Sequence, residues 1–207
     1  MAMRNGRGKQ KQRNTGNRER HRVILFAAEG KNKTETLYFR RFTTKDIQVR
    51  FTSGNETDPE KLMSRLLEEI QENDLNPELG DCAYCLVDAD CNPTKDNQIA
   101  RADEMAKGTM AELIVSNPSF EIWYLCHFTY STKEYHSSDE VEIDLKRQMP
   151  DYSKNRLDMY ERTVSHIDTA VRNAERLEQY NVDAGKKIHT SGFQPSTEVY
   201  KVVKNIR

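Results

Sequence analysis

Three acidic residues follow two apolar segments of the sequence and have the residue types and spacing of a metal site. Asp88 and Asp90 end the run CLVDAD, and Glu29 comes directly after VILFAA. Residues two apart in an extended chain point to the same side. Carboxylates held within about 4–6 Å of one another repel unless a cation compensates, and oxygen ligands suit Mg²⁺. The pattern predicts Glu29, Asp88 and Asp90 as catalytic residues and as ligands of Mg²⁺ or Mn²⁺.

A simpler explanation of these acids stays open, because loops are polar and acids are common where strands end. Two aspartates separated by one residue are a weak signal by themselves. The pair Glu29-Gly30 after an earlier apolar run strengthens the signal. A glycine there lets the backbone approach a metal or a phosphate closely.

The segments around the acids predict an α/β fold. Short apolar or alternating runs indicate strands at residues 23–28, 47–51, 82–87 and 111–115. Segments with helical spacing separate them, which predicts a parallel sheet of about four strands flanked by helices. Ligands bind such sheets beyond the carboxyl ends of the strands, so the three acids are expected at one edge.

The predicted elements and the composition suggest three parts of the chain. Residues 1–22 form a basic arm, residues 23–130 form the α/β core, and residues 131–207 form a helical C-terminal extension packed on that core. The arm holds eight Lys or Arg residues against one Glu, a net charge of +7, whereas the whole chain carries −1. Such an arm is expected to be disordered when free and to bind nucleic acid, although a solubilising tail is the simpler alternative.

A second group of residues lies next to the predicted strand ends and is expected to contact a substrate. A helix N-terminus with nearby lysines suits phosphate, and the turn after the fourth strand reaches the same edge. The candidates are Gly30, Lys31, Lys33, Thr34, Ser116, Asn117, Glu121 and Lys187. For most of them a solvated surface position is the alternative, and Glu121 could simply interact with a helix dipole.

Other classes of protein are disfavoured. Cys82 and Cys85 are spaced as C-x-x-C, but three steps along a strand reverse the side-chain direction, so buried, reduced thiols are expected instead of a zinc site. No apolar run approaches the roughly 20 residues of a membrane helix. No membrane partner is therefore expected, and the expected localisation is cytoplasmic.

Four motifs resemble a known family. The segments EGKNKTETLYF, LVDAD, SNPSFEIWYLCHF and QPSTEVYKVV occur in the order expected of the RloB-like family of bacterial proteins, and the resemblance runs from about Val23 to the C-terminus. Glu29-Gly30 followed by Asp88-x-Asp90 is also similar to the Toprim signature of topoisomerases, bacterial primases and overcoming-lysogenization-defect nucleases. The resemblance implies a Toprim-like fold in which Asp88 and Asp90 bind metal and Glu29 is a general acid/base or a further ligand.

The resemblance also implies a function. RloB-like proteins are linked to restriction and abortive-infection loci, beside an ATPase of the ABC/AAA type. A Mg²⁺-dependent nuclease that cleaves phosphodiester bonds of DNA, RNA or tRNA in antiphage defence is expected, with nucleic acid and the ATPase as partners and a homo-oligomer left open. The alternative is a non-catalytic regulatory or binding subunit of an ATPase-based defence complex. A phosphotransferase or primase-like polymerase ranks lowest, because the sequence has no P-loop.

Overall fold

The computed structural model describes residues 20–29, 33–154 and 156–207. The strands are β1 (Arg22–Ala27), β2 (Ile47–Phe51), β3 (Cys82–Asp88), β4 (Ala111–Asn117) and β5 (Ser196–Thr197). The α-helices are α1 (Lys33–Phe39), α2 (Pro59–Glu72), α3 (Asp96–Ala106), α4 (Glu121–Cys126), α5 (Ser138–Gln148), α6 (Met159–Thr163), α7 (Ile167–Asp183) and α8 (Val199–Ile206). None of the helices in these ranges is long and apolar enough to cross a membrane.

The described strands form one five-stranded sheet in the order β2-β1-β3-β4-β5. β1 to β4 are parallel, and β5 runs antiparallel to β4. The chain moves outward from β1 to β2 and then crosses to β3 and β4, so the strand order reverses between β1 and β3. The predicted α/β fold with a mostly parallel sheet is confirmed, and the reversal point is where such sheets bind ligands.

β5 adds a strand that the apolar pattern did not predict. It has two residues, and Ser116 and Asn117 of β4 pair with Thr197 and Ser196. The hydroxyls of Ser116 and Thr197 also lie 2.9 Å apart. A strand this short is determined by its pairing with β4 and not by its own sequence pattern. Because β5 belongs to the C-terminal extension, the extension contributes a strand to the sheet as well as helices.

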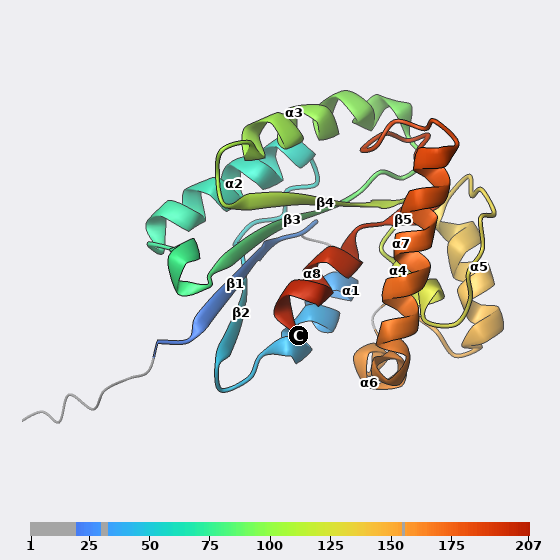
Figure 1. The fold of residues 1–207 in the computed structure, drawn as a ribbon, viewed down its shortest axis with the longest axis horizontal. Coiled ribbons are helices and arrows are strands. Elements are labelled where there is room, and N and C mark those ends of the chain that lie inside the picture. Colours follow the sequence, from blue (N-terminus) through green and yellow to red (C-terminus); the bar gives the residue numbers. More distant parts are fainter. Residues whose placement is uncertain (1–19, 30–32, 155) are drawn as a thin grey trace, which may run out of the picture.

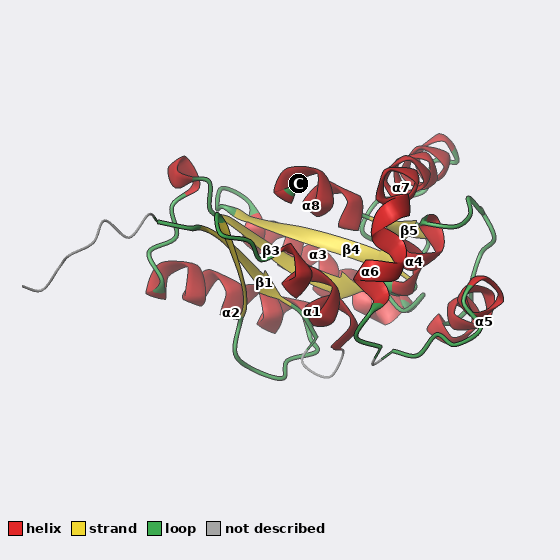
Figure 2. Ribbon diagram, turned by 90° about the horizontal axis from the view of Figure 1, so that it is seen from below, coloured by secondary structure: helices red, strands yellow, loops and turns green. Residues whose placement is uncertain are grey.

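Helices cover both faces of the sheet (Figures 1 and 2), and each face carries its own apolar layer. Ile24 and Phe26 of β1 pack with α1 and α8, whereas their neighbours Leu25 and Ala27 pack with α2 and α3. This alternation follows from the two-residue repeat of a strand. Beyond the strand ends, α4 to α7 form a helical layer (Figure 1).

α2 shows how local sequence defines an element of this fold. Asp58 caps the helix, because its Oδ1 accepts from the backbone N–H groups of Glu60 and Lys61, and Pro59 occupies the first turn. Leu62 and Leu66, one turn apart, are buried against the sheet. The helix therefore begins at Pro59.

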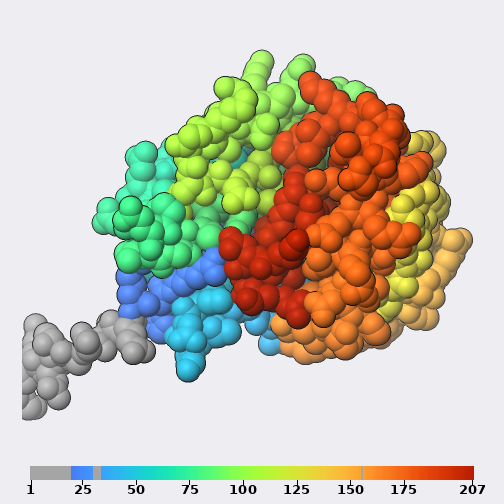
Figure 3. Space-filling model, viewed as in Figure 1, coloured from blue at the N-terminus to red at the C-terminus, as the bar shows by residue number. Residues whose placement is uncertain are grey.

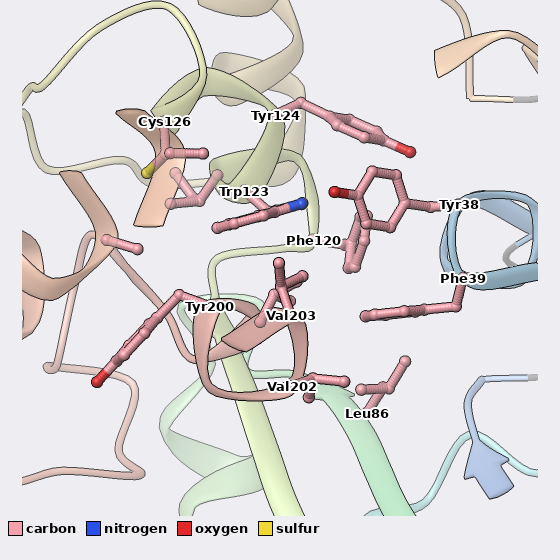
Figure 4. Packing of buried hydrophobic residues seen from close by; sticks show 14 of the residues in the cluster. Tyr38, Phe39, Leu86, Phe120, Trp123, Tyr124, Cys126, Tyr200, Val202 and Val203 are labelled. Atoms are coloured by element: carbon pink, nitrogen blue, oxygen red, sulfur yellow. The ribbon is translucent and has the colours of Figure 1, made fainter. Parts of the chain in front are cut away.

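An aromatic cluster joins α1 to α4 (Figure 4). The Tyr38 ring lies 5.8 Å from that of Phe120 and 5.7 Å from that of Tyr124, both edge-on. Such edge-to-face contacts add to the stability gained from burying the rings. Glu35 and Glu121 each precede one of these tyrosines by three residues and so share its helix face. The aromatic core therefore brings two acids together at the carboxyl edge of the sheet.

The basic arm lies mostly outside the described residues, which begin at Arg20. Arg20 forms an ion pair with Asp81, and Arg22 is already part of β1. The predicted buried thiols are borne out in part: Cys85 is buried, Cys82 is half-buried, and both are free. Their side chains face opposite layers of the core.

Candidate functional site

The three predicted acids lie at the point where the strand order reverses. Glu29 follows β1 by two residues, and Asp88 is the last residue of β3, which pairs with β1. Asp90 lies in the turn that follows. The structure therefore brings Glu29, Asp88 and Asp90 to one place, because parallel neighbouring strands end at the same edge.

The turn after β3 is held in an unusual conformation. Asp90 and Cys91 have φ angles of +54° and +52°, in the left-handed region that residues with a Cβ seldom adopt. The end of β4 holds the turn: Ala89 N donates to Ser116 O, and Asp90 N donates to Pro118 O, both at 2.9 Å. Strain of this kind persists only where surrounding contacts enforce it, and it is concentrated at functional sites.

A lysine that the sequence did not single out lies among the acids. Lys95 Nζ donates to Asp90 Oδ2 at 2.6 Å, to the Asp88 carbonyl oxygen at 3.0 Å and to Glu29 Oε1 at 3.2 Å. Burial lowers the pKa of Lys95, but its bonds to Asp90 and its attraction to Glu29 outweigh burial and raise the pKa. For Glu29, burial outweighs the effect of Lys95, and its pKa is raised.

The oxygens around Lys95 Nζ are the donor types that Mg²⁺ and Mn²⁺ prefer, two carboxylates and a carbonyl. Within the described ranges, no three His, Cys, Asp or Glu side chains form a ready-made metal geometry. The ammonium of Lys95 lies where a metal cation bound to these oxygens would lie. The donor types therefore suit a hard divalent ion, although Lys95 occupies the position between them.

A second, deeper group of carboxyls lies behind the first and consists of Glu35, Asp88 and Glu121, all of them buried. Burial and the charges of Glu121 and Glu29 raise the pKa of Glu35 to about 8. The pKa of Asp88 is raised well above its ordinary value by burial and by the charges of Glu35 and Glu121. Protons therefore occupy part of this group at neutral pH, and a bound cation would favour their release.

Within the deeper group, Glu121 is held from both sides. Its Oε2 accepts from the Ser119 hydroxyl at 2.6 Å, and its Oε1 accepts from the Tyr152 hydroxyl at 2.9 Å. Glu35 Oε2, in contrast, is buried without a hydrogen-bond partner among the described residues. A signal for Glu35 did exist in the sequence, because an acid shares its helix face with Tyr38, Phe39 and Phe42. Tyr152 carried no comparable signal.

The remaining substrate candidates occupy different positions. Ser116 and Asn117 are buried with their polar groups engaged: Asn117 Nδ2 donates to the carbonyls of Thr190 and Ser191, and its Oδ1 accepts from Cys91 N. They position β5 and the turn after β3. The buried Thr34 hydroxyl donates to Lys154 O at 3.1 Å.

Four candidates remain to be placed. Lys187 is exposed in the loop after α7. That loop lies against the first turn of α3, where Ser191 N donates to Asp96 Oδ1 at 2.7 Å (Figure 3). Gly30 and Lys31 lie outside the described residues, and Lys33 begins α1 with its side chain outside the description. Their predicted contacts with substrate stay predictions.

Comparison with known proteins agrees with the motifs. A family model described as RloB-like protein matches residues 24–206, which include the acids, Lys95 and Tyr152. No curated protein and no solved structure gives a match. Because the matched region covers most of the chain, this protein belongs to the RloB-like family.

Proposed function

We propose that this protein is a metal-dependent nuclease that hydrolyses phosphodiester bonds of nucleic acid with Mg²⁺ or Mn²⁺. One observation carries the proposal: carboxylate oxygens of Glu29 and Asp90 and the backbone carbonyl oxygen of Asp88 surround a single cationic group where the strand order reverses, with the Asp88 carboxyl buried directly behind. A divalent ion bound there would supply a nucleophilic water and neutralise charge on the phosphate.

The chain's own residues have separate tasks in this proposal. Asp90 would bind the ion through its carboxylate, whereas Asp88 would present its backbone carbonyl and add its carboxyl from the deeper group behind it. Glu29 would share that task or accept the proton of the attacking water, since burial raises its pKa above its ordinary value and makes it a stronger base. Ser119 and Tyr152 hold Glu121, so the deeper carboxyls keep a fixed arrangement behind the ion.

A Toprim-type site and a role in antiphage defence beside an ABC/AAA-type ATPase are further parts of the proposal. The first is supported by the position of Glu29-Gly30 after β1 and of Asp88-x-Asp90 at the end of β3. The second is supported by membership of the RloB-like family. The basic arm would add salt-dependent affinity for the phosphate backbone.

The test compares two substitutions of the same kind. Wild type, Asp88→Asn and Asp74→Asn, which changes an exposed aspartate at the end of α2, are incubated with labelled DNA, RNA and tRNA, with and without the ATPase. We expect cleavage that requires Mg²⁺ or Mn²⁺ in wild type and in Asp74→Asn, and no cleavage in Asp88→Asn. Folded wild type that leaves every substrate intact beside its ATPase would contradict the proposal.

A non-catalytic subunit remains the second candidate, because Lys95 already compensates part of the negative charge. The two candidates differ in what Asp88→Asn does in cells. A nuclease loses defence and keeps its assembly with the ATPase, whereas a structural subunit loses both or neither.

A further inference from the structure

We infer that Lys95 is a built-in cation that holds the place of a divalent ion between Glu29 and Asp90, and that the ion binds only when Lys95 moves out. The inference rests on the proposed function, because it takes these acids as metal ligands. It adds a residue that sets the affinity of the site for the ion.

The geometry is that of a filled cation site. An ammonium has three N–H donors, and Lys95 Nζ has three acceptors, from Glu29 after β1, Asp88 in β3 and Asp90 in the turn. The Lys95 and Glu29 side chains are both only 16% exposed, so water competes little for the bond between them, whereas the Asp90 side chain is 46% exposed. By contrast, Lys107 directly after α3 has an exposed ammonium, and its ion-pair partner among the described residues is Glu104.

Lys95 and a divalent ion cannot share this position. The oxygens lie 2.6–3.2 Å from Nζ, whereas Mg²⁺ needs oxygens at about 2.0–2.1 Å and would repel an ammonium so close. The carboxylates of Glu29 and Asp90 must therefore move inward as Lys95 moves out.

The backbone around Lys95 is suited to such an exchange. Lys95 ends the 3-10 turn Pro93–Lys95, which Asn92 caps by accepting from Thr94 N at 3.0 Å. α3 begins at the next residue. With the backbone fixed on both sides, the flexible four-carbon stem of the lysine is the part that moves.

The consequence is a lowered affinity for the free ion. Displacing Lys95 breaks three hydrogen bonds to charged or carbonyl oxygens before the ion gains its own. Removing the ammonium should therefore tighten ion binding, although it deletes contacts of the folded site. If Lys95 had a purely structural role, its removal should instead weaken ion binding, because its loss would loosen the turn that carries Asp90.

The test titrates Mn²⁺ into each protein and follows the electron paramagnetic resonance signal of the free ion. The proteins are wild type, Lys95→Met, Lys95→Gln, Lys107→Met and the double variant Asp88→Asn with Asp90→Asn. Lys107→Met is the matched control, since it removes the same charge away from the acids. We expect both Lys95 variants to bind Mn²⁺ about tenfold more tightly than wild type, Lys107→Met to match wild type, and the double variant to lose binding.

Thermal unfolding supplies a second readout. In EDTA the Lys95 variants should melt below wild type, because Glu29 and Asp90 then repel without compensation, and Mn²⁺ should raise their melting temperature more than it raises that of wild type. Equal or weaker Mn²⁺ binding in folded Lys95 variants, with binding still lost in the double variant, would overturn the inference and leave the metal site standing. Absence of Mn²⁺ binding in every protein, or binding that survives in the double variant, would overturn both.

Discussion

Two buried aspartates at opposite ends of β3 have opposite surroundings. Asp81, just before the strand, accepts from Val23 N at 2.8 Å, Asn76 N at 2.9 Å and the Arg20 guanidinium at 2.6 Å. Burial raises the pKa of Asp81, but these donors outweigh it and lower the pKa. Asp88, at the other end, has four acids as neighbours, and its pKa is raised.

The carboxylate of Asp81 therefore stabilises the folded protein, whereas the carboxylate of Asp88 destabilises it. Asp81 ties β1 to β3 and is satisfied as a carboxylate. Asp88 lies at an edge rich in carboxyls, where its ionisation is unfavourable. Such an environment is expected of a cation-binding site in the absence of its cation. The same substitution at the two positions should therefore have different effects.

The largest effect is expected for Asp88→Asn on catalysis. The variant should lose metal-dependent cleavage by about a thousandfold or more, because an amide is a poor ligand for a hard cation. Its free energy of unfolding in EDTA at neutral pH should equal or exceed that of wild type. The folded state holds the Asp88 proton more tightly than the unfolded chain does, so wild type loses stability as pH rises through the folded pKa. Cleavage assays and chemical denaturation measure the two effects.

Asp81→Asn should destabilise the protein by about 3 kcal/mol, because one amide cannot accept from three donors and leaves buried N–H groups unpaired. The lowered pKa of Asp81 means that its contribution is present above its unfolded value of 3.8 and is lost as pH falls through the folded value. Urea denaturation at neutral and acid pH measures both, with Asp74→Asn as the control. If Asp81→Asn lowered the free energy of unfolding by less than Asp88→Asn does, the contrast between the two ends of β3 would be wrong.

Glu35→Gln should stabilise the protein in EDTA at pH 8 by about 2 kcal/mol, and the gain should vanish near pH 4.5. The folded pKa of Glu35 is about 8 against an ordinary value of 4.5, so wild type loses stability as pH rises between them. A neutral glutamine avoids that loss. Denaturation over this pH range, with exposed Glu72→Gln as the control, measures the effect, and a gain independent of pH would argue against it.

The smallest effect concerns the basic arm, which leads into β1 at the amino edge, opposite the acids. Deletion of residues 1–19 removes six basic residues and one acid. It should weaken binding to non-specific DNA by about tenfold at low salt and reduce the salt dependence. Mn²⁺ affinity should not change, because the acids lie at the other end of the strands. Fluorescence anisotropy at several salt concentrations tests the first part, and a changed Mn²⁺ affinity would contradict the separation of the two edges.

Much of the core could be predicted because its pattern is local. β2 runs from Ile47 to Phe51 as predicted, and β3 and β4 differ from prediction only at their ends. Glu29 and Asp88 could be assigned to one edge of the sheet because each follows or ends a strand, and the carboxyl ends of parallel strands lie at the same edge.

The rest depends on contacts between distant segments. Lys95 reaches the acids across the turn at Asp90 and Cys91, where both residues adopt left-handed conformations that Asp visits occasionally and Cys seldom. Tyr152 comes 31 residues after Glu121, and the pairing of β5 spans a longer separation. The spacing of residues within one segment carries no information about contacts with a segment so far away in the sequence.

The most direct test of the central claim is the anomalous scattering of Mn²⁺ in crystals of the wild-type protein. The account predicts an anomalous peak between the carboxylates of Glu29 and Asp90 and next to Asp88, with the Lys95 side chain turned away from them. A peak elsewhere, or a Lys95 ammonium still bonded to Glu29 and Asp90 in crystals that hold Mn²⁺ at another position, would contradict it.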